Sequence, residues 1–218
     1  MTATDLLDRV AAELYSGLLS DACDRLGLVS RVVQPGIRPA WDGAVLCGNA
    51  RIMHAEATGW QPMSPYARQI EALDRLRPDD LVISTIGRDP GCGLWGELFS
   101  TAARARGARG ALVDGNIRDT VKIAAMRYPV FNRGFSPMDS LGRLEVVPDL
   151  TVSVVGGVEI HDGDLVFGDI DGIVVVPEAR AQEVLDLAFA KHDAENTMRA
   201  DIEAGSLLAD AFARHRVL

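Results

Sequence analysis

The sequence predicts a layered α/β domain. In the first half of the chain, segments with helical spacing alternate with short apolar segments that are typical of strands, whereas strand-like segments dominate from 129 to 177. This mixture is typical of helices packed on a sheet, and not of a helical bundle or a β-sandwich. No Pro-, Gly- or Ser-rich linker divides the 218 residues, so we expect one domain over 1–218.

Helices are predicted where apolar residues recur at spacings of three and four and where end signals flank them. The first covers 5–18. A second, shorter helix covers 20–26, with Ser20 as a suitable N-cap and Gly27 as a suitable stop. Further helices are predicted over 61–76, 96–106, 117–126 and 178–203.

Strands are predicted where short apolar, partly β-branched segments end at turn residues. The segment 81–86 is typical of a buried strand, and 173–176 gives the strongest strand signal in the chain. The glycine-rich segment 87–96 and the four Asp-Gly pairs are predicted turns. Further strands are predicted over 44–53, 111–113, 129–132, 145–155, 157–160 and 165–167.

The composition allows a substantial core and argues against nucleic acid as a partner. Apolar residues make up 48% of the chain, so a core can form and extended disorder is not expected. The net charge is -9 and the pI about 4.9, whereas a phosphate backbone attracts basic surfaces. A small anionic substrate remains compatible, because one local arginine can outweigh a distant net charge.

The cysteines and the hydropathy pattern indicate the compartment. Cys23, Cys47 and Cys92 are odd in number and widely spaced, which fits neither a disulfide framework nor a zinc pattern but fits a reducing compartment. The start, MTATDLLDRVAAEL, is acidic and amphipathic, unlike a signal peptide. No apolar segment approaches the roughly 18 residues that a spanning helix needs. We therefore expect a soluble cytoplasmic protein with no membrane partner.

The segment 91–120, GCGLWGELFSTAARARGARGALVDGNIRDT, is the predicted active site. One predicted helix and one predicted strand separate Glu97 from Asp119, so both carboxylates and Arg118 can reach one edge of a sheet. Ligand groups collect at such edges in open α/β folds. Carboxylates suit a hard divalent cation, and arginine suits an anionic substrate. Backbone N–H groups at the helix start can also hold a small carboxylate.

Each of these features also has a simple structural explanation. Glu97 and Asp119 can each interact with the dipole of a helix start, and Arg118 can be a solvated surface residue. The glycines match the pattern G-x-G-x-x-G, so a dinucleotide site is a further alternative. The long loop with Pro90, and Trp95 at the place where a pyrophosphate should approach, disfavour a nicotinamide cofactor.

Four segments resemble the RraA-like family, which holds 4-hydroxy-4-methyl-2-oxoglutarate/4-carboxy-4-hydroxy-2-oxoadipate aldolases and the regulator of ribonuclease E activity A. The resemblance implies a layered β/β/α swivelling-type domain with N-terminal helices and a long C-terminal helix. It also implies a homotrimer or homohexamer with a site between neighbouring subunits. The matching segments are SDACDRLG (20–27), GLWGELFSTAARARGARGALVDGNIRD (93–119), YPVFNRG (128–134) and VGGVEIHDGDLVFGDIDGIVVVP (155–177).

The resemblance implies a divalent metal, Mg²⁺ or Mn²⁺, and assigns its ligands. Asp119 would coordinate the metal directly, and Glu97 would hold a metal-bound water. Glu195 of the neighbouring subunit's C-terminal helix is the best match for a glutamate that reaches the metal waters.

The resemblance also assigns groups that bind the substrate, a small oxoacid. Arg118 would contact the oxygens of this oxoacid. The helix start at Gly96, with the backbone amides of Leu98 and Phe99, would hold the pyruvyl carboxylate.

The expected function is a class II aldolase that cleaves a 4-hydroxy-2-oxo acid, such as 4-hydroxy-4-methyl-2-oxoglutarate, to pyruvate and a second oxo acid. Oxaloacetate decarboxylation is the expected side activity. The metal and Arg118 would stabilise the developing negative charge, and a water held by Glu97 would accept the hydroxyl proton. Three alternatives stay open: a Schiff-base aldolase, with Lys122 as the nearest lysine, a lyase for another acid, and a non-catalytic regulator that binds a protein such as ribonuclease E.

Overall fold

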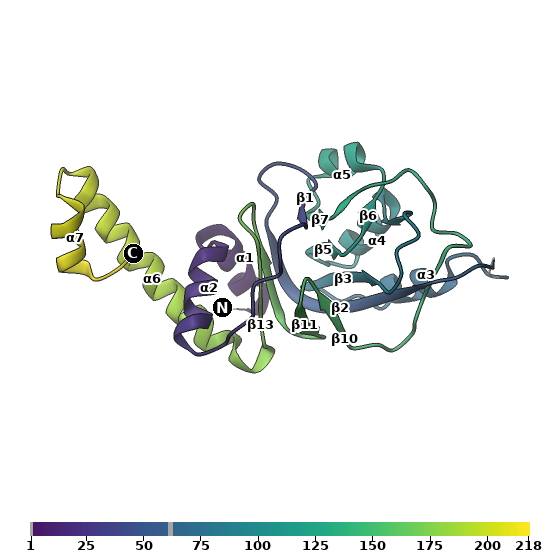
Figure 1. The fold of residues 1–218 in the computed structure, drawn as a ribbon, viewed down its shortest axis with the longest axis horizontal. Coiled ribbons are helices and arrows are strands. Elements are labelled where there is room, and N and C mark those ends of the chain that lie inside the picture. The colour runs from purple at the N-terminus through teal and green to yellow at the C-terminus, as the bar shows by residue number, and fades with distance from the viewer. Residues whose placement is uncertain (1, 61–62) are drawn as a thin grey trace.

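Residues 2–60 and 63–218 are described by a computed structural model, in which helices are layered on a curved sheet, as the sequence predicts (Figure 1). The described residues contain seven α-helices and a 3₁₀ turn at Glu178–Arg180. None of these helices combines the length and the apolar character that crossing a membrane requires. The helices are α1 (Ala3–Glu13), α2 (Ser16–Arg25), α3 (Ala67–Asp74), α4 (Glu97–Ala105), α5 (Thr120–Met126), α6 (Ala181–Glu203) and α7 (Leu208–His215).

The main sheet has the strand order β1-β7-β5-β3-β2-β12-β13, with β9 paired to the end of the long strand β2. Four central strands, β2, β3, β5 and β7, run parallel, and the remaining strands pair antiparallel with their neighbours. Its strands are β1 (Arg38–Pro39), β2 (Leu46–Ala57), β3 (Asp80–Ile86), β5 (Gly110–Val113), β7 (Val130–Asn132), β9 (Leu144–Val146), β12 (Leu165–Gly168) and β13 (Ile173–Val176).

Two small sheets complete the β-structure. The hairpin of β10 (Val152–Val155) and β11 (Val158–His161) is antiparallel. The other sheet consists of three very short parallel strands, each of which follows β3, β5 or β7 along the chain. These strands are β4 (Gly93–Trp95), β6 (Asn116–Ile117) and β8 (Gly134–Phe135).

The central strands are buried on both faces, which explains their continuous apolar sequences. On β3, Val82 belongs to the core shared with α3, α4 and α5, whereas Leu81 and Ile83 belong to the core shared with β10 and β11. This alternation follows from the two-residue period of a strand. A third core joins α1, α2 and α6 to β12 and β13, and from there α6 extends away from the sheet with α7 folded back beside it (Figure 1).

The predicted helix over 5–18 is wrong, because two helices occupy this region. α1 ends at Glu13 and α2 begins at Ser16, so Ser20 lies inside α2 and is not its N-cap. The break has a long-range cause: the backbone N–H and the hydroxyl of Ser16 both donate to Asp169, in the turn between β12 and β13. A cap supplied from so far along the chain leaves no local sequence signal.

Other boundaries also differ from the prediction. The predicted turn 87–96 contains β4, the predicted strand 145–155 is divided between β9 and β10, and the predicted helix 117–126 begins only at Thr120. The start of the predicted helix 61–76 includes 61–62, which lie outside the described residues; α3 itself begins at Ala67. The strands predicted over 81–86 and 173–176 and the long C-terminal helix are confirmed.

Candidate active site

The small parallel sheet brings the predicted site residues together. β4 pairs with β6 through Gly93 with Asn116 and Trp95 with Ile117. The pairing continues beyond the strands, because the backbone N–H of Arg118 donates to the carbonyl oxygen of Trp95 at 2.9 Å. The start of α4 and the Arg118-Asp119 pair therefore lie side by side, as the sequence predicts.

Asp119 is held in an unusual backbone conformation beside the start of α4. Its φ is 58°, in the left-handed region, where Asp is one of the more tolerant residues. Its Oδ2 accepts a hydrogen bond from the backbone N–H of Glu97 at 3.3 Å and lies 3.8 Å from Nε of Arg118. The Asp119 carboxylate is thus aimed at the helix start and is 39% exposed, so it stays accessible to a ligand.

Gly96 permits this close approach. A Cβ at position 96 would lie 2.9 Å from Oδ2 of Asp119 and 3.3 Å from Cγ of Arg118. Gly93 is also close, since its Cβ position lies 3.4 Å from Cβ of Arg118. These two glycines of the G-x-G-x-x-G pattern therefore make room for the Arg-Asp pair of the same chain.

Two residues that the sequence analysis did not single out complete the polar end of the site. Nη1 of Arg118 lies 3.3 Å from Oδ1 of Asp139, and the Tyr66 hydroxyl donates to the same Asp139 carboxylate. Burial acts to raise the pKa of Asp139, but the Tyr66 hydrogen bond and the Arg118 charge outweigh it and hold the pKa below its usual value. Asp139 is therefore ionised at neutral pH and anchors the guanidinium of Arg118.

The start of α4 offers backbone donors beside these side chains. The first-turn amides of a helix have no carbonyl partner within the helix, so those of Leu98 and Phe99 are available to a small anion. The Glu97 side chain is half-buried, and its Oε1 accepts a hydrogen bond from the Thr101 hydroxyl at 3.1 Å.

A pocket of about 370 Å³ joins the Arg118-Asp119 pair to Leu98 and Phe99 at the helix start, whereas the predicted site residue Glu97 does not line it. Arg118, Asp119 and Asp139 line it together with residues of β4, α3 and α4. Lys122 is exposed on α5 and does not line this pocket, which disfavours it as a Schiff-base nucleophile.

The carboxylates fit a hard cation that keeps several waters. In the described part of the chain, no three His, Cys, Asp or Glu side chains gather closely enough to form a complete metal site. Mg²⁺ is usually held by one or two carboxylates, with waters and substrate oxygens as its other ligands. Asp119 can supply one such carboxylate, and Glu97, whose backbone N–H contacts Asp119, begins the adjacent helix, whereas Asp139 is engaged by Arg118 and Tyr66.

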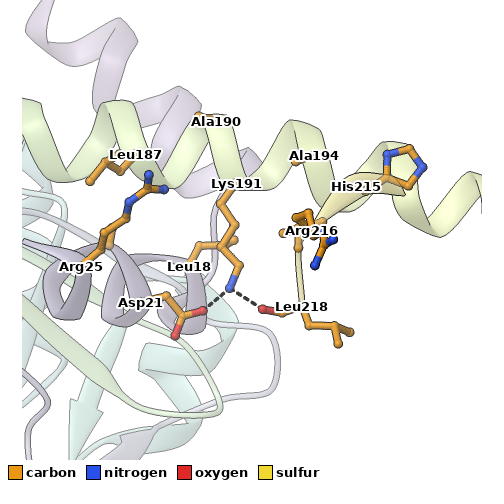
Figure 2. A pocket seen from close by; sticks show the side chains of 12 residues that line it. Leu18, Asp21, Arg25, Leu187, Ala190, Lys191, Ala194, His215, Arg216 and Leu218 are labelled. Atoms are coloured by element: carbon orange, nitrogen blue, oxygen red, sulfur yellow. Dashed lines mark hydrogen bonds and ion pairs between the residues drawn. The ribbon is translucent and has the colours of Figure 1, made fainter. Parts of the chain in front are cut away.

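Glu195 is not brought to this pocket within the chain. It lies on α6, where it accepts a hydrogen bond from the Tyr15 hydroxyl and lies 3.7 Å from Lys191. Figure 2 shows the neighbouring cavity, of about 400 Å³, in which Lys191 donates to Asp21 and to the carbonyl oxygen of Leu218. The role of Glu195 in a neighbouring subunit's site stays a prediction.

The sequence of the chain matches a family model, "RraA-like: Aldolase/RraA", over residues 17–175. The chain belongs to the RraA-like family. The matched region includes Glu97, Arg118 and Asp119, whereas α6 and α7 lie beyond it. The family and the fold that the four segments predict are therefore confirmed.

Three named relatives are similar in sequence to this chain, and the aligned region covers a different fraction of each relative. A putative 4-hydroxy-4-methyl-2-oxoglutarate aldolase of Halalkalibacterium halodurans is 28% identical, covering 79% of this chain and 77% of the relative. Protein DlpA of Legionella pneumophila is 26% identical over 90% of this chain, and uncharacterized protein MJ0644 of Methanocaldococcus jannaschii is 33% identical over 54% of it. The chain spans only 31% of the length of DlpA and 56% of the length of MJ0644.

Solved structures share the fold over most of the chain. An uncharacterized protein from Pseudomonas syringae pv. tomato is 30% identical, with a TM-score of 0.79 over 96% of this chain and 97% of the other. RraAS2 of Streptomyces coelicolor, described as an unusual member of the RNase ES inhibitor RraA protein family, is 25% identical, with a TM-score of 0.76 over 91% and 97%. A chain from a set described as novel cellulases from gut-associated microbes is 29% identical, with a TM-score of 0.83 over 90% and 88%.

Proposed function

We propose that this chain is a divalent-metal-dependent lyase that cleaves a 4-hydroxy-2-oxo acid to pyruvate and a second carbonyl compound. 4-Hydroxy-4-methyl-2-oxoglutarate is the reference substrate, with oxaloacetate decarboxylation as a side activity. The proposal depends on one observation: Asp119, Arg118 and the first-turn amides of α4 line one pocket. Membership of the RraA-like family and the name of the Halalkalibacterium relative support it.

Different residues at the site would bind the metal, orient the substrate and stabilise the developing charge. When bound by Asp119, and through a water by Glu97, Mg²⁺ or Mn²⁺ supplies a Lewis acid for the 2-oxo group. The amides of Leu98 and Phe99 orient the substrate carboxylate. Arg118 donates to the oxygen on which negative charge develops as the bond breaks.

Proton transfer and orientation fall to the remaining polar groups. Through a water, Glu97 accepts the proton of the 4-hydroxyl group. Asp139 keeps the Arg118 guanidinium in position through their ion pair, and the Tyr66 hydroxyl supports this arrangement by donating a hydrogen bond to the Asp139 carboxylate.

The first test measures pyruvate release from 4-hydroxy-4-methyl-2-oxoglutarate and from oxaloacetate with Mg²⁺, with Mn²⁺ and with a chelator. The diagnostic variant is Asp119→Asn, because asparagine tolerates the left-handed backbone and keeps one oxygen while the charge is lost. We expect turnover to require metal and to fall about 10²–10³-fold in this variant, as when an active site loses a charge-stabilising group.

Asp114→Asn is the matched control. The Asp114 carboxylate also follows a parallel strand, but it pairs with Arg133 and does not line the pocket. Equal activity losses in both variants, or full metal-dependent turnover in Asp119→Asn, would contradict the assignment.

A protein-binding regulator is the second candidate, because the chain shares its fold with RraAS2 over 91% of its length. Tight capture of a ribonuclease E-type protein by a folded, metal-loaded sample, with no pyruvate from any oxoacid tested, would favour this role.

We also propose that the protein assembles as a homotrimer or homohexamer in which a neighbouring subunit covers the site. Large apolar side chains around the site face outward: Leu98 is 73% exposed, Val121 85% and Phe135 65%. Val121 follows Asp119 by two positions, and Phe135 pairs with Ile117 across β6 and β8. A neighbouring subunit is the simplest cover for such a face.

A further inference from the structure

The indole of Trp95 is buried against the first turn of α4, and none of the reaction steps proposed above uses it. Its Nε1 donates a hydrogen bond to Oγ of Ser100 at 2.8 Å. The Ser100 hydroxyl donates in turn to the carbonyl oxygen of Gly96 at 3.1 Å. Because a hydroxyl can accept one hydrogen bond and donate another, both polar side chains are satisfied. We call these two hydrogen bonds the Trp95-Ser100 link.

The backbone of Trp95 holds the other half of the site. Its carbonyl oxygen accepts the backbone N–H of Arg118 at 2.9 Å, and Trp95 pairs with Ile117 across β4 and β6. Between β4 and α4 the chain turns at Gly96, and a glycine restricts the direction of the following helix only weakly. Trp95 therefore supplies a second connection, from Arg118 through its backbone to α4 through its side chain.

The same indole also contacts the residue that carries one of the proposed carboxylate-binding amides. The ring of Phe99 packs edge-on against the ring of Trp95, with 5.7 Å between the ring centroids and 75° between the ring planes. An indole fixed by Ser100 and packed on Phe99 thus sets where the first-turn amides point relative to Arg118. The link lies within one chain, so it is the same whichever subunit covers the site.

We infer that Ser100 is a positioning residue, which acts through Trp95 to hold the carboxylate-binding amides of α4 in register with Arg118. This inference rests on the proposed function. Ser100 itself touches no substrate, because its side chain is fully buried and does not line the pocket. A hydrogen bond that only stabilises the fold predicts a different result, namely a loss of stability without a change in substrate binding.

Ser100→Ala removes the hydroxyl and leaves the buried indole N–H of Trp95 without this partner. Two quantities are measured with Mg²⁺: pyruvate release from the faster of 4-hydroxy-4-methyl-2-oxoglutarate and oxaloacetate, and the binding of pyruvate itself by isothermal titration. We expect KM to rise and the affinity for pyruvate to fall by about fivefold each, the equivalent of one hydrogen bond. Because the amides hold the carboxylate before and during bond cleavage, kcat should stay close to the wild-type value.

Tyr128→Phe is the matched control, because it also removes one buried hydroxyl. Tyr128 is 2% exposed, donates to the carbonyl oxygen of Ala108 at 3.3 Å and does not line the pocket. Thermal melts should show a comparable loss of stability in both variants, whereas KM and the pyruvate affinity of Tyr128→Phe should match the wild type. Unchanged values in Ser100→Ala, or an equal weakening in Tyr128→Phe, would overturn the inference.

A double-mutant cycle tests whether Ser100 acts through Trp95. Trp95→Phe removes the indole N–H but keeps an aromatic ring beside Phe99, so the Ser100 hydroxyl no longer has an indole to hold. In the Trp95→Phe background, Ser100→Ala should change KM and the pyruvate affinity by less than about twofold. If instead the effects of the two substitutions are additive, Ser100 does not act through Trp95 and the inference fails.

The outcomes also separate this inference from the proposed function. If the wild type releases pyruvate but Ser100→Ala behaves as Tyr128→Phe does, the positioning role fails and the lyase assignment stands. If the wild type releases pyruvate from neither acid, the proposed function itself fails and the positioning role fails with it.

Discussion

The absence of a side chain at Gly96 decides how closely Asp119 approaches the start of α4. In Gly96→Ala, the new methyl group would meet the Asp119 carboxylate at 2.9 Å, a separation that real Cβ atoms essentially never show. Either the Arg118-Asp119 pair or the helix start must shift to relieve this contact. Displacement of catalytic groups impairs catalytic geometry severely. We expect kcat/KM for pyruvate release to fall about 10²-fold.

Gly172→Ala is the control for this substitution, because a Cβ at position 172 meets no atom within 4 Å and the backbone is not left-handed. Its activity should match the wild type. Thermal melts of both variants distinguish a displaced site from a failure to fold. Retention of wild-type activity in Gly96→Ala would show that the close packing is not needed.

At the scale of elements, the boundary between α1 and α2 shows what local patterns miss. The apolar spacing of 5–18 continues through the break, since Leu14 and Leu18 are both buried in the core under α1, α2 and α6. The chain nevertheless leaves the helix at Leu14, and Asp169 then caps Ser16. Periodicity therefore identified the buried face correctly, but the position of the break depends on a contact formed only in the folded protein.

The hydrogen bond from Tyr15 to Glu195 links this boundary to α6. Burial first, and then this hydrogen bond, raises the pKa of Tyr15 from 10.0 to about 12. Because the folded state favours the protonated Tyr15 hydroxyl, this group contributes its full stability below pH 10. That contribution is lost as the pH rises from 10 to about 12. We expect Tyr15→Phe to lower the free energy of unfolding by about 1 kcal/mol at pH 8. Between pH 10 and about 12, the variant should lose less stability than the wild type.

Urea unfolding at pH 8, 10 and 11.5 measures this difference. Tyr128 serves as an internal reference, because it is retained in both proteins and burial raises its pKa as well. Parallel stability curves for the two proteins would mean that Tyr15 and Glu195 are not coupled in solution.

For the whole molecule, the arrangement of strands explains which parts of the site were predictable. Glu97, Arg118 and Asp119 come from one continuous segment, in which β4 and β6 pair directly, so their convergence follows from a short stretch of chain. Tyr66 and Asp139 come from the start of α3 and from the loop after β8, and only the complete fold brings them together. The three strands of the small sheet were missed because two or three residues are too few to show a period.

The assembly of the whole molecule is open to a direct test at the face around the site. The double variant Val121→Asp/Phe135→Asp places two charges on side chains that are 85% and 65% exposed in the single chain. If another subunit covers them, each charge would be buried unpaired and the oligomer would dissociate. Light scattering should give three or six times 23.4 kDa for the wild type and about 23.4 kDa for the variant.

Ile170→Asp is the control for this experiment, because its side chain is similarly exposed but lies in the turn between β12 and β13. Its mass should equal that of the wild type. Circular dichroism shows whether each variant is folded. If Glu195 of a neighbouring subunit completes the site, dissociation should also abolish pyruvate release, whereas a fully active monomer would show that one chain carries the entire site.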